Sequence, residues 1–117
     1  MTIQRPTDSF QPAPRPPFEA QRLRDLYSLK VLDTEAEQRF DRYTQLAADL
    51  FKVPIALVSL VDEDRQWFKS ATGTELRETE RSISLCGHVV ANNEPMVVED
   101  AWNDQRFANN PLVQGDP

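Results

Sequence analysis

The chain has 117 residues, enough for one small domain, and 39% of them are hydrophobic, which is typical of a protein with a packed core. Its net charge of −6 argues against binding to nucleic acid or anionic membrane surfaces, and no apolar run reaches the roughly 20 residues of a membrane-spanning helix. The single cysteine excludes an internal disulfide and favours a reducing compartment, so we expect a cytoplasmic protein without membrane insertion in this segment.

Residues 1–18 differ in composition from the rest of the chain. They hold five of the nine prolines and few large apolar side chains. Proline cannot propagate a helix, and a segment poor in apolar groups cannot build a core. We therefore expect a disordered, proline-rich leader over residues 1–18 and one domain over residues 19–117.

Two amphipathic helices are predicted next. The first covers residues 19–32, where Leu23, Leu26 and Tyr27 recur at helical spacing. Thr34 and Glu37 then form the capping-box pattern of a second helix that runs to about residue 51. The inner face of this second helix is expected to carry its apolar side chains, namely Phe40, Tyr43, Leu46, Ala47 and Leu50.

A β-hairpin is predicted after the second helix. Residues 55–61 form a nearly continuous apolar run with β-branched members, which favours a central strand covered on both faces. The acidic residues 62–64 form a turn, and the alternation over residues 65–71 completes an antiparallel pair. Residues 74–81 are charged and without period, so we expect an exposed loop.

The last third of the chain is expected to return to short elements. Ser82 or Ser84 can cap a helix that ends at residues 93–95, and residues 96–100 have the composition of a strand. Residues 104–109 form a turn or short helix that places Phe107 inward. The inner face of the capped helix is expected to consist of Leu85, His88, Val89 and Asn92.

Several separate blocks of this sequence resemble the N-terminal part of a GAF domain. They are LYSLKVLDT at residues 26–34, FDRYTQLAA at 40–48, PIALVSLVDEDRQWFKS at 54–70, SLCGH at 84–88 and DQRFANNPLV at 104–113. They look most like the GAF modules at the front of bacterial sensor histidine kinases, which belong to two-component systems, and of diguanylate cyclases.

The resemblance implies an α+β, GAF-like (PAS-like) fold. Such a fold has an antiparallel sheet flanked by helices, with a small-molecule pocket on the face opposite them. It also implies C-terminal strands and a final helix that this sequence lacks, so we expect a truncated domain. An open sheet edge and exposed apolar faces favour association, and we expect a homodimer or a domain-swapped oligomer.

Cys86 and His88 are the only cysteine and the only histidine. A thiolate beside an imidazole could form a redox switch, a chromophore attachment point or half of a metal site. The two residues are two positions apart, however, and such residues do not face each other on a helix. We expect no metal site and no catalytic residue. Half-buried packing groups are the simpler interpretation of both, and contact with a ligand is the alternative.

A small ligand is the expected partner, and the sequence requires no cofactor. Large aromatic side chains form pocket walls, while aspartates either orient a polar ligand or stabilise local turns. No nucleophile elbow, phosphate-binding glycine loop or HExxH motif is present. The candidate ligand-binding residues are Cys86, His88, Asp100, Trp102, Asp104 and Phe107.

The resemblance implies a small-molecule-sensing or regulatory module of a bacterial signal-transduction protein, with any catalysis in an attached output domain. Two alternatives stay open. One is a structural dimerisation module in which residues 19–32 pair with their symmetry mate through Leu26 and Tyr27. The other is a thiol-redox sensor or enzyme that acts through Cys86.

Overall fold

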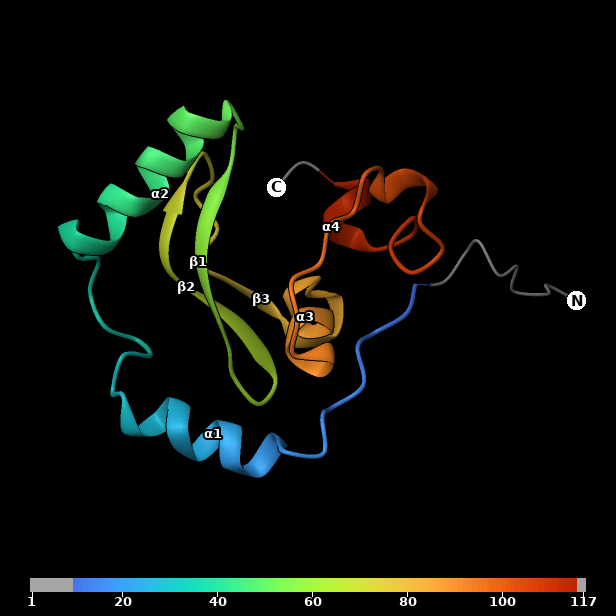
Figure 1. Cartoon of the computed structure of the whole chain (residues 1–117), viewed down its shortest axis with the longest axis horizontal. Coiled ribbons are helices and arrows are strands. Elements are labelled where there is room, and N and C mark those ends of the chain that lie inside the picture. Colours follow the sequence, from blue (N-terminus) through green and yellow to red (C-terminus); the bar gives the residue numbers. More distant parts are fainter. Residues whose placement is uncertain (1–9, 116–117) are drawn as a thin grey trace, which may run out of the picture.

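The computed structural model describes residues 10–115, which form an α+β fold (Figure 1). Helix α2 packs along a β-hairpin, α3 contacts β1 from the other side, and α1 lies near the hairpin turn (Figure 1). The expected antiparallel sheet is confirmed, with strand order β1-β2-β3. The elements are α1 (Glu19–Ser28), α2 (Gln38–Phe51), β1 (Ala56–Val61), β2 (Arg65–Thr72), β3 (Glu78–Glu80), η2 (Arg81–Ile83), α3 (Cys86–Asn92), η3 (Ala101–Asn103) and α4 (Pro111–Gln114).

The predicted hairpin forms from β1 and β2. Asp62 N donates to Arg65 O at 2.8 Å to close the turn, and the register shifts by a bulge between residues 58 and 59. The expectation that residues 55–61 form the central strand is wrong within the described chain. Strand β2 has neighbours on both edges and buries Trp67 and Phe68, whereas β1 pairs on one edge only and leaves Leu57 exposed.

Strand β3 corrects the prediction of an exposed loop over residues 74–81. It pairs antiparallel with β2, with Glu78 opposite Trp67 and Glu80 opposite Arg65. Both glutamates are exposed. An edge strand tolerates such charges, and they also protect it from pairing with other chains. The charged residues that predicted a loop therefore belong to an edge strand.

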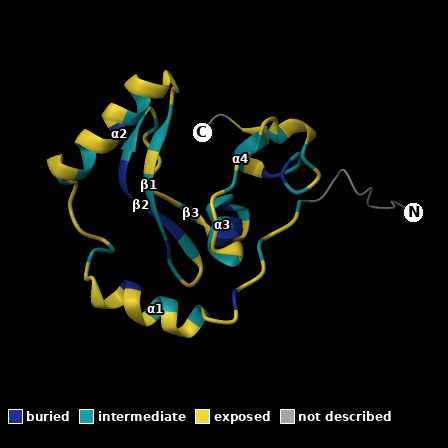
Figure 2. Cartoon of the chain, in the orientation of Figure 1, coloured by how far each residue is buried: buried dark blue, intermediate teal, exposed yellow. Residues whose placement is uncertain are grey.

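Helix α2 turns a different side to the sheet from the one predicted. Thr44 is buried, whereas Tyr43, Leu46 and Leu50 are exposed, as the colouring of α2 illustrates (Figure 2). The facing strand carries hydroxyl groups at residues 70 and 72, and both bond to Thr44. Buried hydroxyls need partners, so these hydrogen bonds rather than the apolar stripe set the rotation of the helix.

The boundaries of the first two helices also differ from the prediction. Helix α1 ends at Ser28 instead of residue 32, because Lys30 has a left-handed backbone with φ of 52°. The predicted capping box does not form, and α2 begins at Gln38. The Thr34 hydroxyl instead donates to Val31 O and accepts a hydrogen bond from Lys69.

Residues 10–18, which fall within the expected disordered leader, make contacts with the domain, while residues 1–9 lie outside the described part of the chain. Gln11 N donates to Arg106 O at 3.0 Å, and Pro16 is buried. The side chain of Ala13 lies beside Gly87, whose hydrogen leaves room for it. The prolines keep this segment extended, and its small side chains let it pack on α3.

The C-terminal third follows the prediction in part. Ser84 Oγ accepts a hydrogen bond from Gly87 N at 3.1 Å, as a helix cap should, and the left-handed Asn93 ends α3. Phe107 is buried as expected, but Asn92 is exposed. Residues 96–100 form no strand, because none of the described strands lies beside them to complete a ladder.

Candidate functional site

A cleft opens between α2 and β2 where the chain leaves the sheet. Strand β3 pairs with residues 65–67 of β2, and Phe68 N donates to Arg77 O, but residues 74–76 form no ladder pairs with β2. The gap is a cavity of about 450 Å³ lined by Ala36, Asp41, Gln45 and residues 70–72 and 74–77. The resemblance implied a pocket on the face opposite the helices, whereas this cavity lies beside α2.

Hydroxyl groups of β2 line the inner wall of the cleft, and they are hydrogen-bonded to the buried Thr44 of α2. Thr72 donates to the Thr44 hydroxyl at 2.9 Å, Thr44 lies 2.9 Å from Ser70 Oγ, and Ser70 donates to Asp41 Oδ1 at 2.5 Å. Ser70 donates its proton to the carboxylate of Asp41, so this series of hydrogen bonds ends at the negatively charged Asp41 on the cavity wall. This wall can accept hydrogen bonds from a ligand.

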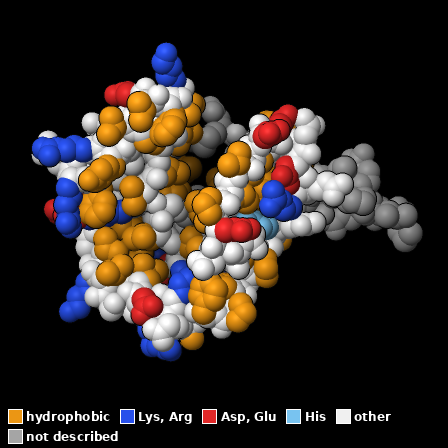
Figure 3. All heavy atoms as spheres, in the orientation of Figure 1, with side chains coloured by type: hydrophobic (Ala, Val, Ile, Leu, Met, Phe, Trp, Pro, Cys, Tyr) orange, Lys and Arg blue, Asp and Glu red, His pale blue; other side chains and the backbone are white. Residues whose placement is uncertain are grey.

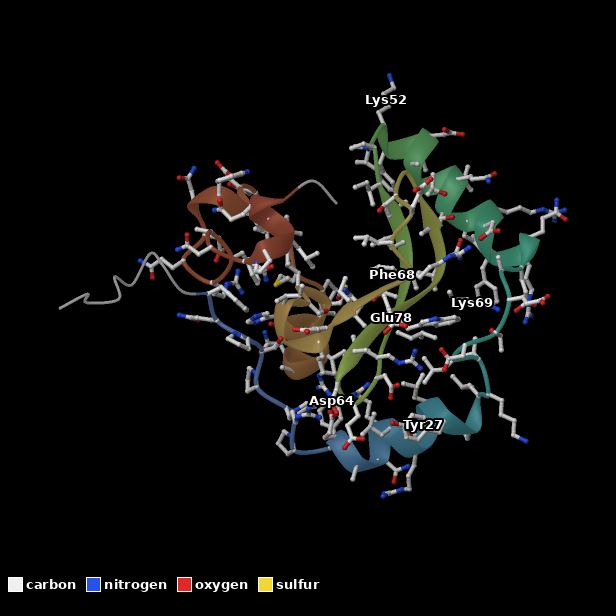
Figure 4. All side chains as sticks on the ribbon, turned by 180° about the vertical axis from the view of Figure 1, so that it is seen from behind. Tyr27, Lys52, Asp64, Phe68, Lys69 and Glu78 are labelled. Atoms are coloured by element: carbon white, nitrogen blue, oxygen red, sulfur yellow. The ribbon has the colours of Figure 1, made fainter. Side chains whose placement is uncertain are left out.

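Lys69 lies at the second cavity, of about 370 Å³, which shares Ala36 and Arg77 with the first. Its buried ammonium donates to Thr34 Oγ1 at 2.7 Å and to Glu35 O at 2.6 Å, and forms an ion pair with Glu37. Hydrogen bonding from Lys69 lowers the pKa of Glu37. Figure 4 shows Lys69 between β2 and the connection from α1 to α2. This lysine therefore anchors the connection and has no free proton for a ligand.

Arg77 supplies the positive charge of the cleft. It lines both cavities, and its guanidinium has no hydrogen-bond or ion-pair partner among residues 10–115. Asp41 and Glu75 line the larger cavity with it. The cleft therefore presents one unpaired cation together with carboxylates and hydroxyls, an arrangement suited to a polar molecule with an anionic group.

His88 and Phe107, two of the predicted ligand-binding residues, contact each other, and neither lines the two cavities described above. Their rings are perpendicular with centroids 5.0 Å apart. His88 Nε2 donates to Gln11 O at 2.9 Å. Both side chains are buried. His88 is thus a satisfied packing residue that fastens residues 10–18 to α3, which was the simpler of the two sequence interpretations.

Cys86 begins α3 and is half-buried. Burial raises the pKa of its thiol, and a hydrogen bond with Ser59 of β1 offsets the rise only in part. The reactive form of cysteine is the thiolate, so this environment disfavours redox or nucleophilic chemistry. Cys86 joins α3 to β1 as a packing group.

The remaining three predicted residues form local contacts. Asp100 caps η3 by accepting hydrogen bonds from Trp102 N and from the Asn103 side chain. Asp104 pairs with Arg106, whose guanidinium lies over the Phe107 ring, and this pairing lowers the pKa of Asp104. Trp102 is 60% exposed. None of the six predicted residues lines either of the two cavities beside α2.

Comparison with protein-family models decides the family of this chain. The model of the GAF domain matches residues 35–117, which include α2, the sheet and α3. The chain belongs to the GAF domain family. The family inferred from the sequence blocks is therefore confirmed.

This GAF domain is also similar to part of a larger signalling enzyme. It is 36% identical over 104 residues to a cyclic di-GMP phosphodiesterase of Pseudomonas aeruginosa. The match covers 89% of this chain but 18% of that protein. The expected link to sensor kinases and diguanylate cyclases stays a prediction, because this relative is a phosphodiesterase.

The cleft of the GAF domain contains residues that sequence reasoning missed. Asp41, Ser70, Thr72 and Arg77 come from three segments, and no motif joins them. The one available signal was the pair of hydroxyl residues at positions 70 and 72, two apart on a strand and therefore on one face. Polar residues at that spacing within an otherwise buried strand indicate a polar neighbour.

The described part of the GAF domain contains neither a membrane-spanning helix nor a metal-binding cluster. Across residues 10–115, no helix has the length and hydropathy to cross a membrane. In the same residues, no group of three or more His, Cys, Asp or Glu side chains is arranged to hold a metal ion.

Proposed function

We propose that this GAF domain is a regulatory module that binds a small polar molecule with an anionic group in the cleft between α2 and β2. The observation that carries the proposal is the Arg77 guanidinium, without a partner among residues 10–115, at a cavity of about 450 Å³ that Asp41 also lines. A cavity of this volume lies within the usual range for small-molecule sites, which is roughly 300–1,000 Å³.

The module regulates and does not itself catalyse a reaction. The similarity to a cyclic di-GMP phosphodiesterase, of which the matched region is a small part, supports a role beside a catalytic domain of cyclic-dinucleotide signalling. Helix α2 forms one wall of the cleft, so a ligand that draws α2 toward residues 74–77 changes the position of this helix. An attached domain in contact with α2 responds to that change. A cytoplasmic location stays a prediction from the single cysteine.

Ligand binding is tested by thermal denaturation of the chain with a panel of amino acids, nucleobases and cyclic nucleotides. We expect at least one compound with a carboxylate or phosphate to raise the melting temperature. Arg77→Gln should weaken binding of that compound about tenfold or more, because a charge-assisted hydrogen bond contributes about 1.5–3 kcal/mol. Arg24→Gln, at an exposed position on α1, is the matched control. If no compound stabilises the chain, or if both variants bind equally, the cleft is not the site.

The thiol-redox alternative gains no support from the environment of Cys86, where burial raises the pKa of the thiol. The dimerisation alternative gains support from a different surface from the one expected. Leu26 is buried, and the Tyr27 hydroxyl donates to Asp62 at 2.7 Å, so α1 uses both residues within the domain. The exposed apolar residues of α2 are therefore the stronger basis for self-association.

A further inference from the structure

The hydroxyl groups at the wall of the cleft have no proton left for a ligand. A carboxylate only accepts hydrogen bonds, so the single hydroxyl proton of Ser70 lies in its 2.5 Å contact with Asp41 Oδ1. The hydroxyl proton of Thr44 is shared between Ser70 Oγ at 2.9 Å and Asp41 O at 3.1 Å. Thr72 in turn donates its proton to Thr44 at 2.9 Å. All three hydroxyl protons are therefore used within the protein.

Two residues of this wall can still accept hydrogen bonds. The Thr72 hydroxyl oxygen retains its lone pairs, and no donor to it is present among residues 10–115. Asp41 has a second carboxylate oxygen, and it forms no ion pair within those residues. Both residues line the cavity. A pair of acceptors of which one is charged favours a ligand group that donates hydrogen bonds and is positively charged.

The charges around the cavity disfavour a ligand that is only anionic. Arg77 is the one cation that lines it, whereas Asp41 and Glu75 both line it as carboxylates. Neither carboxylate forms an ion pair among residues 10–115. A purely anionic ligand is attracted by one guanidinium and repelled by two carboxylates. A positive group on the same ligand replaces this repulsion by attraction.

The lining of the cleft also disfavours a large apolar ligand. Hydrophobic side chains gather over α2 on the face of the molecule seen in Figure 3, with Lys and Arg at the margin. Among the residues that line the cleft, by contrast, the apolar ones are Ala36, Ala71 and Leu76, and the others are polar or charged. A ligand that fits this lining is therefore polar over most of its surface.

We propose that the ligand of the cleft is a zwitterion of the amino-acid class, with its ammonium group at Asp41 and Thr72 and its carboxylate at Arg77. Asp41 and Arg77 line one cavity but form no ion pair with each other, so both ends of such a molecule can bind at once. The ammonium group supplies the hydrogen-bond donors that the wall lacks. This inference rests on the proposed function, which requires the anionic group, and it specifies the class of ligand.

Matched ligands test the inference on the parent chain. The common amino acids are screened by thermal denaturation. Each one that stabilises the chain is then compared, by isothermal titration calorimetry, with its desamino analogue, in which hydrogen replaces the ammonium group. We expect at least one amino acid to bind, and its desamino analogue to bind about tenfold more weakly, because the analogue leaves the acceptors of the wall unpaired. If no amino acid binds, or if the desamino analogues bind as tightly, the inference is overturned.

Asp41→Asn tests which residue holds the ammonium group. The variant loses the charge but keeps an oxygen that can accept the hydrogen bond from Ser70. We expect the amino acid to bind about tenfold more weakly to this variant. The desamino analogue should bind at least as tightly as to the parent chain, because one repulsive charge is gone. Asp49→Asn, at an exposed residue of α2 that does not line the cavity, is the matched control.

The ratio of the two dissociation constants, for the amino acid and for its desamino analogue, is the decisive readout. It should fall in Asp41→Asn and remain at the parent value in Asp49→Asn. Thr72→Val removes the other acceptor and should lower the ratio in the same direction. Circular dichroism checks that each variant folds, and the ligand comparison on the parent chain decides the question if Asp41→Asn does not. An unchanged ratio in folded Asp41→Asn and Thr72→Val would overturn the placement of the ammonium group.

Failure of this inference is distinguishable from failure of the proposed function. If carboxylates without an amino group bind as tightly as amino acids, and Arg77→Gln weakens their binding, the cleft is an anion site and the zwitterion is wrong. If no compound of either class binds, or if Arg77→Gln binds the compounds as tightly as the parent chain, the proposed function is wrong as well.

Discussion

The hydroxyl of Thr44 on α2 lies 2.9 Å from that of Ser70 on β2, and both side chains are buried. This contact is where the helix meets the sheet. It fixes the rotation of α2, directs Asp41 toward the cleft and leaves Tyr43, Leu46 and Leu50 exposed. One polar contact therefore accounts for both the candidate site and the outward-facing apolar side chains of α2.

Replacement of Thr44 by valine tests this contact. Valine keeps the volume of threonine but leaves the hydroxyls of Ser70 and Thr72 with one partner fewer. We expect the free energy of unfolding to fall by about 1–3 kcal/mol, the range for a buried polar group that loses a partner. Urea denaturation measures the change. Ser82→Ala, at an exposed serine, is the control and should lie within about 0.5 kcal/mol of the parent chain. Equal losses in both variants would contradict the role of Thr44.

The acid stability of the domain should depend on Glu19. Hydrogen bonds from Arg81 and then from Arg22 lower the pKa of this carboxyl from 4.5 to about 2. A carboxyl whose pKa is lower in the folded state contributes its full stability above the unfolded value. That contribution is lost as the pH falls from 4.5 toward about 2.

Unfolding in urea at a series of pH values tests the contribution of Glu19. Glu19→Gln removes the titrating group, so its stability should fall less steeply than that of the parent chain below pH 4.5. Glu94→Gln changes an exposed glutamate and should keep the steep fall. Parallel curves for all three proteins would show that the bonds to Arg81 and Arg22 contribute nothing measurable.

Gly73 should not tolerate a side chain. Its φ of 87° lies in the left-handed region, and an added Cβ would lie 1.8 Å from Pro54 O. Gly73→Ala must therefore shift the backbone at the end of the hairpin, and we expect a loss of about 2 kcal/mol or more. Thermal denaturation measures the loss, with the exposed Glu75→Ala as the nearby control. An unchanged melting temperature for Gly73→Ala would show that this turn adapts without strain.

The thiol of Cys86 should react slowly while the domain is folded. Burial raises the pKa of the thiol, so little thiolate is present near neutral pH. Alkylation by iodoacetamide at fixed pH should be about tenfold slower or more in the native chain than in the chain unfolded by urea, because the thiolate is both scarce and covered. Mass spectrometry follows the reaction. Similar rates in the two states would restore the thiol-redox interpretation.

The hairpin and the family could be predicted from the sequence, because their signals are local. Residues 56–61 are mostly apolar and include the β-branched Val58 and Val61, and the acidic turn after Val61 separates them from an alternating strand. The GAF resemblance rests on contiguous blocks, and the family match confirms it. Ser84 was one of two serines predicted as a cap, and this signal is also local, since capping depends on residues a few positions apart.

The side of α2 that faces the sheet could not be predicted from the helix alone. Apolar spacing placed Tyr43, Leu46 and Leu50 inward, but the strand opposite presents Ser70 and Thr72, which Thr44 satisfies. These hydrogen bonds join α2 to β2, two segments that are distant in the sequence, so the sequence of the helix alone does not predict them. The cleft could not be predicted for the same reason. Asp41 and Arg77 are far apart in the sequence, and they line one cavity only once β2 and the following turn have folded beside α2.

Residues 10–18 give the domain a mechanical connection that bypasses the sheet. The backbone of Gln11 bonds both to Arg106 and to the ring of His88, and the same segment leads into α1, where Glu19 pairs with Arg81. A force on residues 10–18 is therefore passed to α3, to Arg106 and to η2. The N-terminal segment thus acts as a tie between elements that lie outside the β-ladder.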